Sequence, residues 1–184
     1  VERIGEQKSL LPLTGKPALQ WVLEAALASE MHEIICVVRD LEPVRRQITL
    51  VDERLSWLVH CSAQGGLSSS VIAGLWAIDP KSDGVLYLAS DQPFIRSELI
   101  DALIERFENS KGLIVAPSYQ GQTRSPLLFR REVFPDFLKL TADQSGLVLF
   151  EKYRDKAELI PWHDGDPFTD IGARADCQSL KEPA

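Results

Sequence analysis

The chain has 184 residues, of which 45% are hydrophobic and 26% charged, and its formal net charge is −7 at pH 7. This length suits one well-buried core, so we expect a single domain over residues 1–184. The negative charge and the lack of a basic run disfavour a nucleic-acid partner. No apolar run approaches the roughly 18 residues of a membrane span, so we expect no membrane partner.

The cysteines, Cys36, Cys61 and Cys177, are odd in number and widely spaced. The sequence has no Cys-x-x-Cys pair and no cluster of histidine and cysteine, which argues against zinc. Unpaired cysteines in apolar runs are typical of a reducing compartment, so we expect a cytoplasmic protein.

Helical and strand-like patterns alternate along the chain. Helices are expected at residues 18–29, 43–50, 70–78, 97–107, 134–140, 146–153 and 174–180. Strands are expected at residues 33–38, 57–61, 85–89, 113–116, 127–129 and 159–162. Ser97 is expected to cap the helix that it opens. The alternation predicts an α/β fold in three Rossmann-like layers, with helices on both faces of a mostly parallel central sheet.

The chain opens on a polar loop with no strand before it. A doubly wound sheet normally begins with a strand that leads into its first ligand-binding loop. We therefore expect that this strand and the first half of a glycine-rich loop precede residue 1.

The segment 86–93 joins an apolar, β-prone run to Asp91, Gln92 and Pro93. A strand that ends there would place Asp91 at the carboxyl edge of the sheet, where open α/β folds bind ligands. Asp91 could hold Mg²⁺ on the phosphates of a nucleotide or cap the next helix. Ser97 is the better cap, which favours the ligand role. Asp170, in an acidic loop near the end of the chain, could complete the metal site if the fold brings the two carboxylates together.

Two further loops carry groups suited to a nucleotide. Gly66, Ser69 and Ser70 begin a helix and offer amides and hydroxyls to a base, ribose or phosphate, although a serine-capped flexible loop fits equally well. Arg3 and Lys8 stand around Gly5 in a polar loop, where they could contact a phosphate or simply be solvated.

Arg124 and Ser125 lie in a loop between two strand-like runs. Arg124 could bind a phosphate of a substrate, since guanidinium groups match phosphate oxygens well. A surface hairpin explains the same residues equally well.

Taken in order, these segments resemble the MobA-like NTP transferases of molybdenum cofactor biosynthesis, and most of all the molybdenum-cofactor cytidylyltransferase branch. Arg3, Gly5 and Lys8 keep the spacing of the opening loop of that family, and residues 10–17 read Leu-Leu-Pro-Leu-Thr-Gly-Lys-Pro, which matches the segment that follows it. Residues 66–75, 88–94 and 115–129 resemble three further family segments. The resemblance covers nearly the whole chain.

Several positions depart from the family pattern. Val1 stands where the family usually has serine, and Arg124 with Ser125 replaces a Gly-His pair. Leu147 stands where arginine is common. Gly172 replaces the second carboxylate of an Asp-Ile-Asp motif that begins at Asp170.

The resemblance implies that a phosphate oxygen of molybdopterin attacks the α-phosphorus of CTP and releases pyrophosphate, with Mg²⁺ as cofactor. It implies catalytic roles for Arg3, Lys8 and Asp91, with Asp91 and Asp170 holding the metal. Nucleotide-binding residues would be Gly5, Lys8, Gly66, Ser69, Ser70 and Gln92. The acceptor would be bound by Arg124 and Ser125.

Two other functions remain open on the sequence. The chain could transfer a nucleotidyl group from another NTP or to another phosphorylated small molecule. It could instead be a non-catalytic accessory protein that binds the molybdenum cofactor for a molybdenum hydroxylase, a function favoured by the loss of a carboxylate at Gly172.

Overall fold

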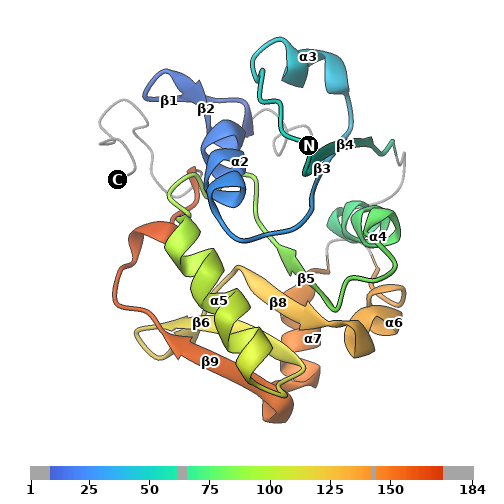
Figure 1. Ribbon diagram of the computed structural model, residues 1–184, viewed down its shortest axis with the longest axis vertical. Helices are drawn as coiled ribbons and strands as arrows, with labels where there is room; N and C mark the ends of the chain where they lie inside the picture. The colour runs from blue at the N-terminus through green and yellow to red at the C-terminus, as the bar shows by residue number, and fades with distance from the viewer. Residues whose placement is uncertain (1–8, 62–65, 142–143, 172–184) are drawn as a thin grey trace.

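The structure is a computed structural model that describes residues 9–61, 66–141 and 144–171 (Figure 1). Among these residues, no helix has the length and apolar character needed to cross a membrane. The strands have these bounds: β1 (Pro12–Leu13), β2 (Lys16–Pro17), β3 (Ile34–Val38), β4 (Leu55–Val59), β5 (Gly84–Tyr87), β6 (Ile114–Tyr119), β7 (Gln122–Thr123), β8 (Leu127–Arg130) and β9 (Ala157–Pro161).

The main sheet runs in the order β5-β8-β6-β7, and β9 pairs with β6. β9 is parallel to β6, whereas β8 lies between β5 and β6 and is antiparallel to both. β5, β6 and β9 therefore point the same way, and their carboxyl ends meet at one edge. β3 and β4 form a separate parallel pair, and β1 with β2 forms a short hairpin.

The helices are α2 (Ala18–Ala28), α3 (Leu41–Arg45), α4 (Leu67–Ala77), α5 (Ser97–Asn109), α6 (Phe134–Phe137) and α7 (Gly146–Lys152). Short 3₁₀ turns are η1 (Arg131–Val133), η2 (Arg154–Lys156) and η3 (Asp166–Phe168). Figure 1 shows α5 across one face of the main sheet and α7 behind it. This arrangement confirms the predicted layers.

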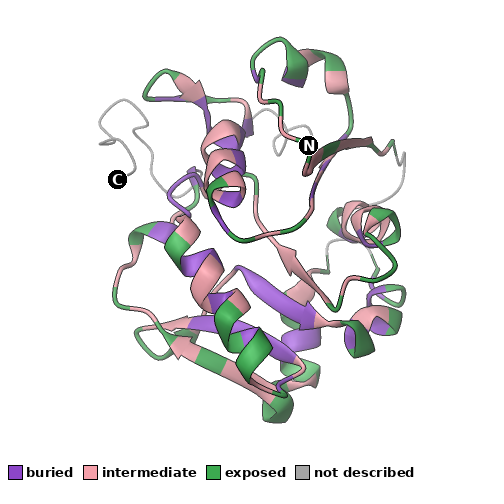
Figure 2. Cartoon of the chain, viewed as in Figure 1, coloured by how far each residue is buried: buried purple, intermediate pink, exposed green. Residues whose placement is uncertain are grey.

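The two faces of the main sheet pack into two cores, because side chains along a strand alternate between its faces. Val115 and Leu128 join the core that contains α2, α3, β3 and α5. Ile114 and Phe129 join the core that contains α6, α7 and Leu75 of α4. Figure 2 shows the buried residues gathered on the sheet and on the inner sides of these helices.

Several predicted boundaries were wrong. The helix expected at 43–50 is α3, which begins earlier because Asp40 accepts a hydrogen bond from Glu42 N at 3.0 Å and so caps it. The helix expected at 70–78 begins at Leu67, directly after Gly66. Ser97 is the first residue of α5 rather than its cap, and Arg96 holds the N-cap position without a capping side chain.

One further difference lies near the start of the described chain. The hairpin of β1 and β2 was not expected; its turn uses Thr14 at φ 49° and Gly15 at φ 89°, a left-handed region in which glycine carries no steric cost. The helix expected at 174–180 lies outside the described residues, as do Arg3, Gly5 and Lys8.

Candidate functional site

The loop after β5 and the loop after β9 meet at the carboxyl edge of the main sheet. The backbone N–H of Ile171 donates to the carbonyl of Asp91 at 2.9 Å. The Nε2 group of Gln92 donates to Oδ1 of Asp170, also at 2.9 Å. The structure therefore brings together the two segments that carry the predicted metal ligands, although 78 residues separate Gln92 from Asp170.

The loop after β9 is held against the sheet by aromatic and charged contacts. The rings of Tyr119 and Phe168 lie 5.7 Å apart. A Cβ atom at Gly165 would lie 2.8 Å from Cζ of Tyr119, so the backbone can pass this ring only without a side chain. Nη2 of Arg96 pairs with Oδ2 of Asp164 at 3.3 Å. These contacts fix the path of the chain towards Asp170.

The N-terminal half of α4 lies next to the end of β5. The Tyr87 hydroxyl donates to the carbonyl of Val71 at 3.3 Å. Burial raises the pKa of the Tyr87 phenol above its usual value, so this group stays a neutral donor. Ser69 Oγ donates to the Gly66 carbonyl at 2.9 Å, which binds the hydroxyl within its own helical turn.

Arg124 and Ser125 follow β7, on the other side of β6 from β9. The backbone N–H of Arg124 donates to the carbonyl of Pro117 at 2.9 Å, and its Nη2 group donates to Oε1 of Gln122 at 2.8 Å. The peptide bond from Ser125 to Pro126 is cis. The predicted hairpin is present, and it places Arg124 near the same edge as the loop after β9.

Lys16 of the Gly-Lys-Pro segment has a structural role. Its Nζ atom lies 2.6 Å from Oε2 of Glu24 and 3.9 Å from the centre of the Trp21 ring. The Lys16 and Gln20 side chains offset the effect of burial and hold the pKa of the Glu24 carboxyl below its usual value. Lys16 therefore anchors the β1–β2 hairpin to α2.

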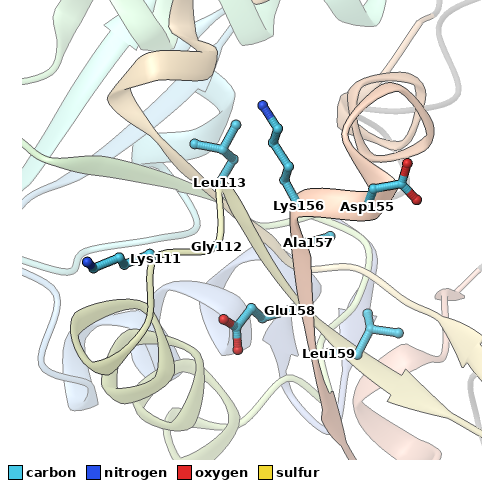
Figure 3. A pocket seen from close by; sticks show the side chains of 8 residues that line it. All are labelled: Lys111, Gly112, Leu113, Asp155, Lys156, Ala157, Glu158 and Leu159. Atoms are coloured by element: carbon cyan, nitrogen blue, oxygen red, sulfur yellow. The ribbon is translucent and has the colours of Figure 1, made fainter.

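A hollow of about 600 Å³ lies at the opposite edge of the main sheet, by the amino ends of β6 and β9. In Figure 3, Lys111, Lys156 and Asp155 on its rim point in different directions. Since these groups do not converge, and since open α/β sheets bind ligands at their carboxyl ends, we place the candidate site at the Asp91 edge.

Residues 2–157 match the model of the MobA-like NTP transferase domain. The chain belongs to this family. Its members are nucleotidyltransferases, so family membership supports a transferase activity for this chain.

The names of individual relatives specify different nucleotides. The chain is 23% identical to a probable molybdenum cofactor guanylyltransferase of Thermococcus sibiricus, over 97% of this chain and 91% of that protein. It is 32% identical to a 2-C-methyl-D-erythritol 4-phosphate cytidylyltransferase of Parasynechococcus marenigrum, over 59% of this chain and 48% of that protein.

A solved structure, that of Rv0371C in complex with manganese from Mycobacterium tuberculosis, superposes with a TM-score of 0.74. It covers 87% of this chain and 84% of its own, at 19% identity. This likeness confirms the nucleotidyltransferase-like α/β fold.

Sequence reasoning missed Arg96, Tyr119 and Trp162, which surround the loop after β9. Trp162 was assigned only to the end of a strand, Tyr119 to the loop that carries Arg124, and Arg96 to no element. Arg96 did carry a signal, because a long cation directly before a helix at the carboxyl edge of a sheet is placed to meet an anionic ligand.

Proposed function

We propose that this protein transfers CMP from CTP to the phosphate of molybdopterin and releases pyrophosphate. The observation that carries this proposal is the junction of the Asp91 and Asp170 loops at the carboxyl edge of β5. Such a transfer needs positioned charges rather than covalent chemistry from the protein. The proposed setting is the cytoplasm, where free thiols such as those of Cys36 and Cys61 persist.

Asp91 and Asp170 offer oxygen donors of the kind that Mg²⁺ prefers. No cluster of three or more potential histidine, cysteine or carboxylate ligands occurs in the described ranges, so the remaining ligands would be substrate oxygens and water. This matches the usual Mg²⁺ site, with one or two carboxylates plus phosphates. When bound, the ion would neutralise charge on the phosphates during attack.

The other proposed roles follow the resemblance to the family. Arg3 and Lys8, with Gly5 between them, would bind the phosphates that leave as pyrophosphate. Gly66, Ser69 and Ser70 at the start of α4 would lie against the base or ribose. Gln92 would act on the nucleotide through Asp170, to which its side chain donates a hydrogen bond. Arg124 and Ser125 would bind the acceptor.

The nucleotide is tested by thermal shift with CTP, GTP, ATP and UTP, each with and without Mg²⁺. A nucleotide at a hundred times its Kd stabilises the folded state by about 2.7 kcal/mol. We expect the largest shift with CTP and Mg²⁺. A larger shift with GTP would contradict the choice of CTP while leaving a nucleotidyltransferase in place.

Catalysis is tested by pyrophosphate release in Asp91→Asn. We expect turnover to fall by about a hundredfold or more while the fold is retained, because the amide cannot replace the carboxylate on a metal ion. Asp83→Asn is the matched control, since Asp83 is exposed at the opposite end of β5. Near-normal turnover in Asp91→Asn would overturn the assignment.

Two alternative functions have specific support. Gly172 removes a carboxylate that the family usually carries, which favours a non-catalytic accessory protein that presents the cofactor to a molybdenum hydroxylase. Such a protein would bind molybdopterin without releasing pyrophosphate. The similarity to a cytidylyltransferase with a different acceptor favours a phosphorylated small molecule other than molybdopterin, and turnover with that acceptor alone would identify it.

A further inference from the structure

Arg96 differs from the arginines that stabilise the fold. Arg54 donates to the carbonyls of Leu27, Ser29 and Met31 and pairs with Asp52, so its guanidinium group is nearly saturated. Arg96 has one charged partner among the described residues, Asp164 at 3.3 Å, and its buried Nε atom has none. A guanidinium group carries five N–H donors, so most of those of Arg96 have no acceptor in the part of the chain that the structure describes.

Two more buried donors at this edge, Nε of Arg124 and Nε1 of Trp162, also lack an acceptor among the described residues. A buried donor without an acceptor costs about 1–3 kcal/mol, so such groups are rare unless something else binds them. Three of the four such side-chain atoms in the described part of the chain belong to these residues.

The three donors lie on the same face of the main sheet. Ile160 pairs with Pro117, and Ile160 and Trp162 both pack against the α5 core. On the other side of β6, Gln122 pairs with Tyr119, whose ring contacts Phe168 of the same core.

Arg124 lies two residues beyond Gln122 and bonds to its side chain, so strand alternation puts both on this face. Figure 1 shows the segment after β9 passing beside the first turn of α5, which Arg96 precedes.

We infer that Arg96, Arg124 and the indole N–H of Trp162 form an oxyanion subsite that binds the phosphate of the acceptor. This inference rests on the proposed function and adds Arg96 as a residue that determines acceptor specificity. Arginine suits this role because its planar fork can donate two parallel hydrogen bonds to a phosphate. The side chain of Arg96 is 33% exposed, so part of it is open to solvent.

Asp164 would hold Arg96 in place before the acceptor arrives. The contact of 3.3 Å is long for a charge-assisted hydrogen bond, which is usually about 2.7–2.9 Å. A phosphate, with a larger charge and several oxygens, can therefore replace or share this contact. The subsite uses side chains other than the Asp91 and Asp170 carboxylates, so it can discriminate acceptors without changing the nucleotide.

The test compares Arg96→Met, Arg96→Lys and Asp164→Asn in steady-state assays of pyrophosphate release. We expect Arg96→Met to raise the KM for molybdopterin by about tenfold or more, with the KM for the nucleotide unchanged. Arg96→Lys should recover part of this loss. Arg106→Met is the matched control, because Arg106 lies at the other end of α5 and pairs with Glu158 at 3.5 Å.

Asp164→Asn distinguishes two roles of Arg96: direct binding of the acceptor, and a purely structural ion pair with Asp164. If Arg96 binds the acceptor directly, Asp164→Asn raises the KM for molybdopterin by clearly less than Arg96→Met does, because it removes the partner of Arg96 and keeps the guanidinium group. Equal losses in Arg96→Met and Asp164→Asn would overturn the inference, as would an unchanged KM in Arg96→Met. A rise in the KM for the nucleotide alone would assign Arg96 to the triphosphate and also overturn it.

A second measurement does not depend on turnover. Titration with inorganic phosphate should show weaker binding to Arg96→Met than to the wild type and to Arg106→Met. If the wild type fails to turn over molybdopterin but this difference is present, the proposed function fails and the subsite stands. If phosphate binds all three proteins equally, the subsite is rejected.

Discussion

At the scale of single residues, Asp136 shows how one carboxylate can join two helices. It lies buried in α6 and accepts from Lys139 Nζ at 2.6 Å and from the Tyr153 hydroxyl at 2.5 Å. Lys152, from α7, also donates to it. These hydrogen bonds, that of Lys139 first, hold the pKa of Asp136 well below its usual value.

We predict that Asp136→Asn lowers the free energy of unfolding at pH 7 by about 2 kcal/mol, because hydrogen bonds to a charged group are lost. Since the folded-state pKa is depressed, the stabilisation is complete above the unfolded-state pKa of about 4 and is lost as the pH falls below it. The gap between wild type and variant in urea unfolding should therefore narrow from pH 5 to pH 3.

Asp155→Asn is the control for this titration, because Asp155 is exposed on the adjacent 3₁₀ turn. Its unfolding free energy should stay within about 0.5 kcal/mol of the wild type. A gap for Asp136→Asn that is constant over this pH range would contradict the role given to the ionised carboxylate.

At the scale of elements, the C-terminal end of α5 is bound by Arg130. Its Nε group donates to the carbonyl of Gly112 at 2.8 Å, and its Nη2 group donates to those of Ser110, at 2.7 Å, and Phe107. The guanidinium carbon also lies 4.0 Å from the centre of the Phe107 ring. Arg130 thus satisfies carbonyls that a helix end leaves without partners and ties α5 to β8.

We predict that Arg130→Lys lowers the free energy of unfolding by about 1–2 kcal/mol, although it keeps the charge. An ammonium group cannot reach three carbonyls in the planar geometry of the fork. Urea unfolding measures the change. Arg154→Lys serves as control, because Arg154 pairs with Glu151 on the surface, where such pairs contribute about 0–1 kcal/mol. Equal changes in both variants would contradict the capping role.

The elements were largely predictable because their patterns are local. The apolar run of β3 and the amphipathic pattern of α5 identify both elements within a few residues. The predicted start of α5 was wrong because serine is a common N-cap residue, whereas here Ser97 is already the first helical residue and no side chain caps the helix. The β1–β2 hairpin was missed because its strands have two residues each, too few for a periodic pattern.

At the scale of the whole molecule, the site depends on contacts that no local pattern contains. The sequence predicted Asp91 and Asp170 as possible partners, and the fold brings their loops together. It did not predict Arg96 beside Asp164, because that contact depends on where the chain turns after β9. The strand expected before residue 1 and the roles of Arg3, Gly5 and Lys8 stay predictions.

The close packing of the loop after β9 allows a test of whether its position matters for the site. The Tyr119 ring lies so close to Gly165 that a Cβ atom there would be 2.8 Å from both Cζ and the hydroxyl oxygen. The ring cannot swing away freely, because it packs against Phe168. Gly165→Ala should therefore displace the loop, and with it Asp170 relative to Asp91.

We predict that Gly165→Ala lowers the rate of pyrophosphate release by about tenfold or more, since a shift of about 1 Å in a reacting group can cost a hundredfold. Far-UV circular dichroism should show an unchanged fold. Gly112→Ala is the control, because its Cβ would meet Cγ of Glu158 at 2.6 Å, a similar clash at the opposite edge of the sheet from Asp91 and Asp170. If Gly165→Ala kept the wild-type rate, the position of Asp170 would not matter for transfer, and Asp91 alone would have to hold the metal.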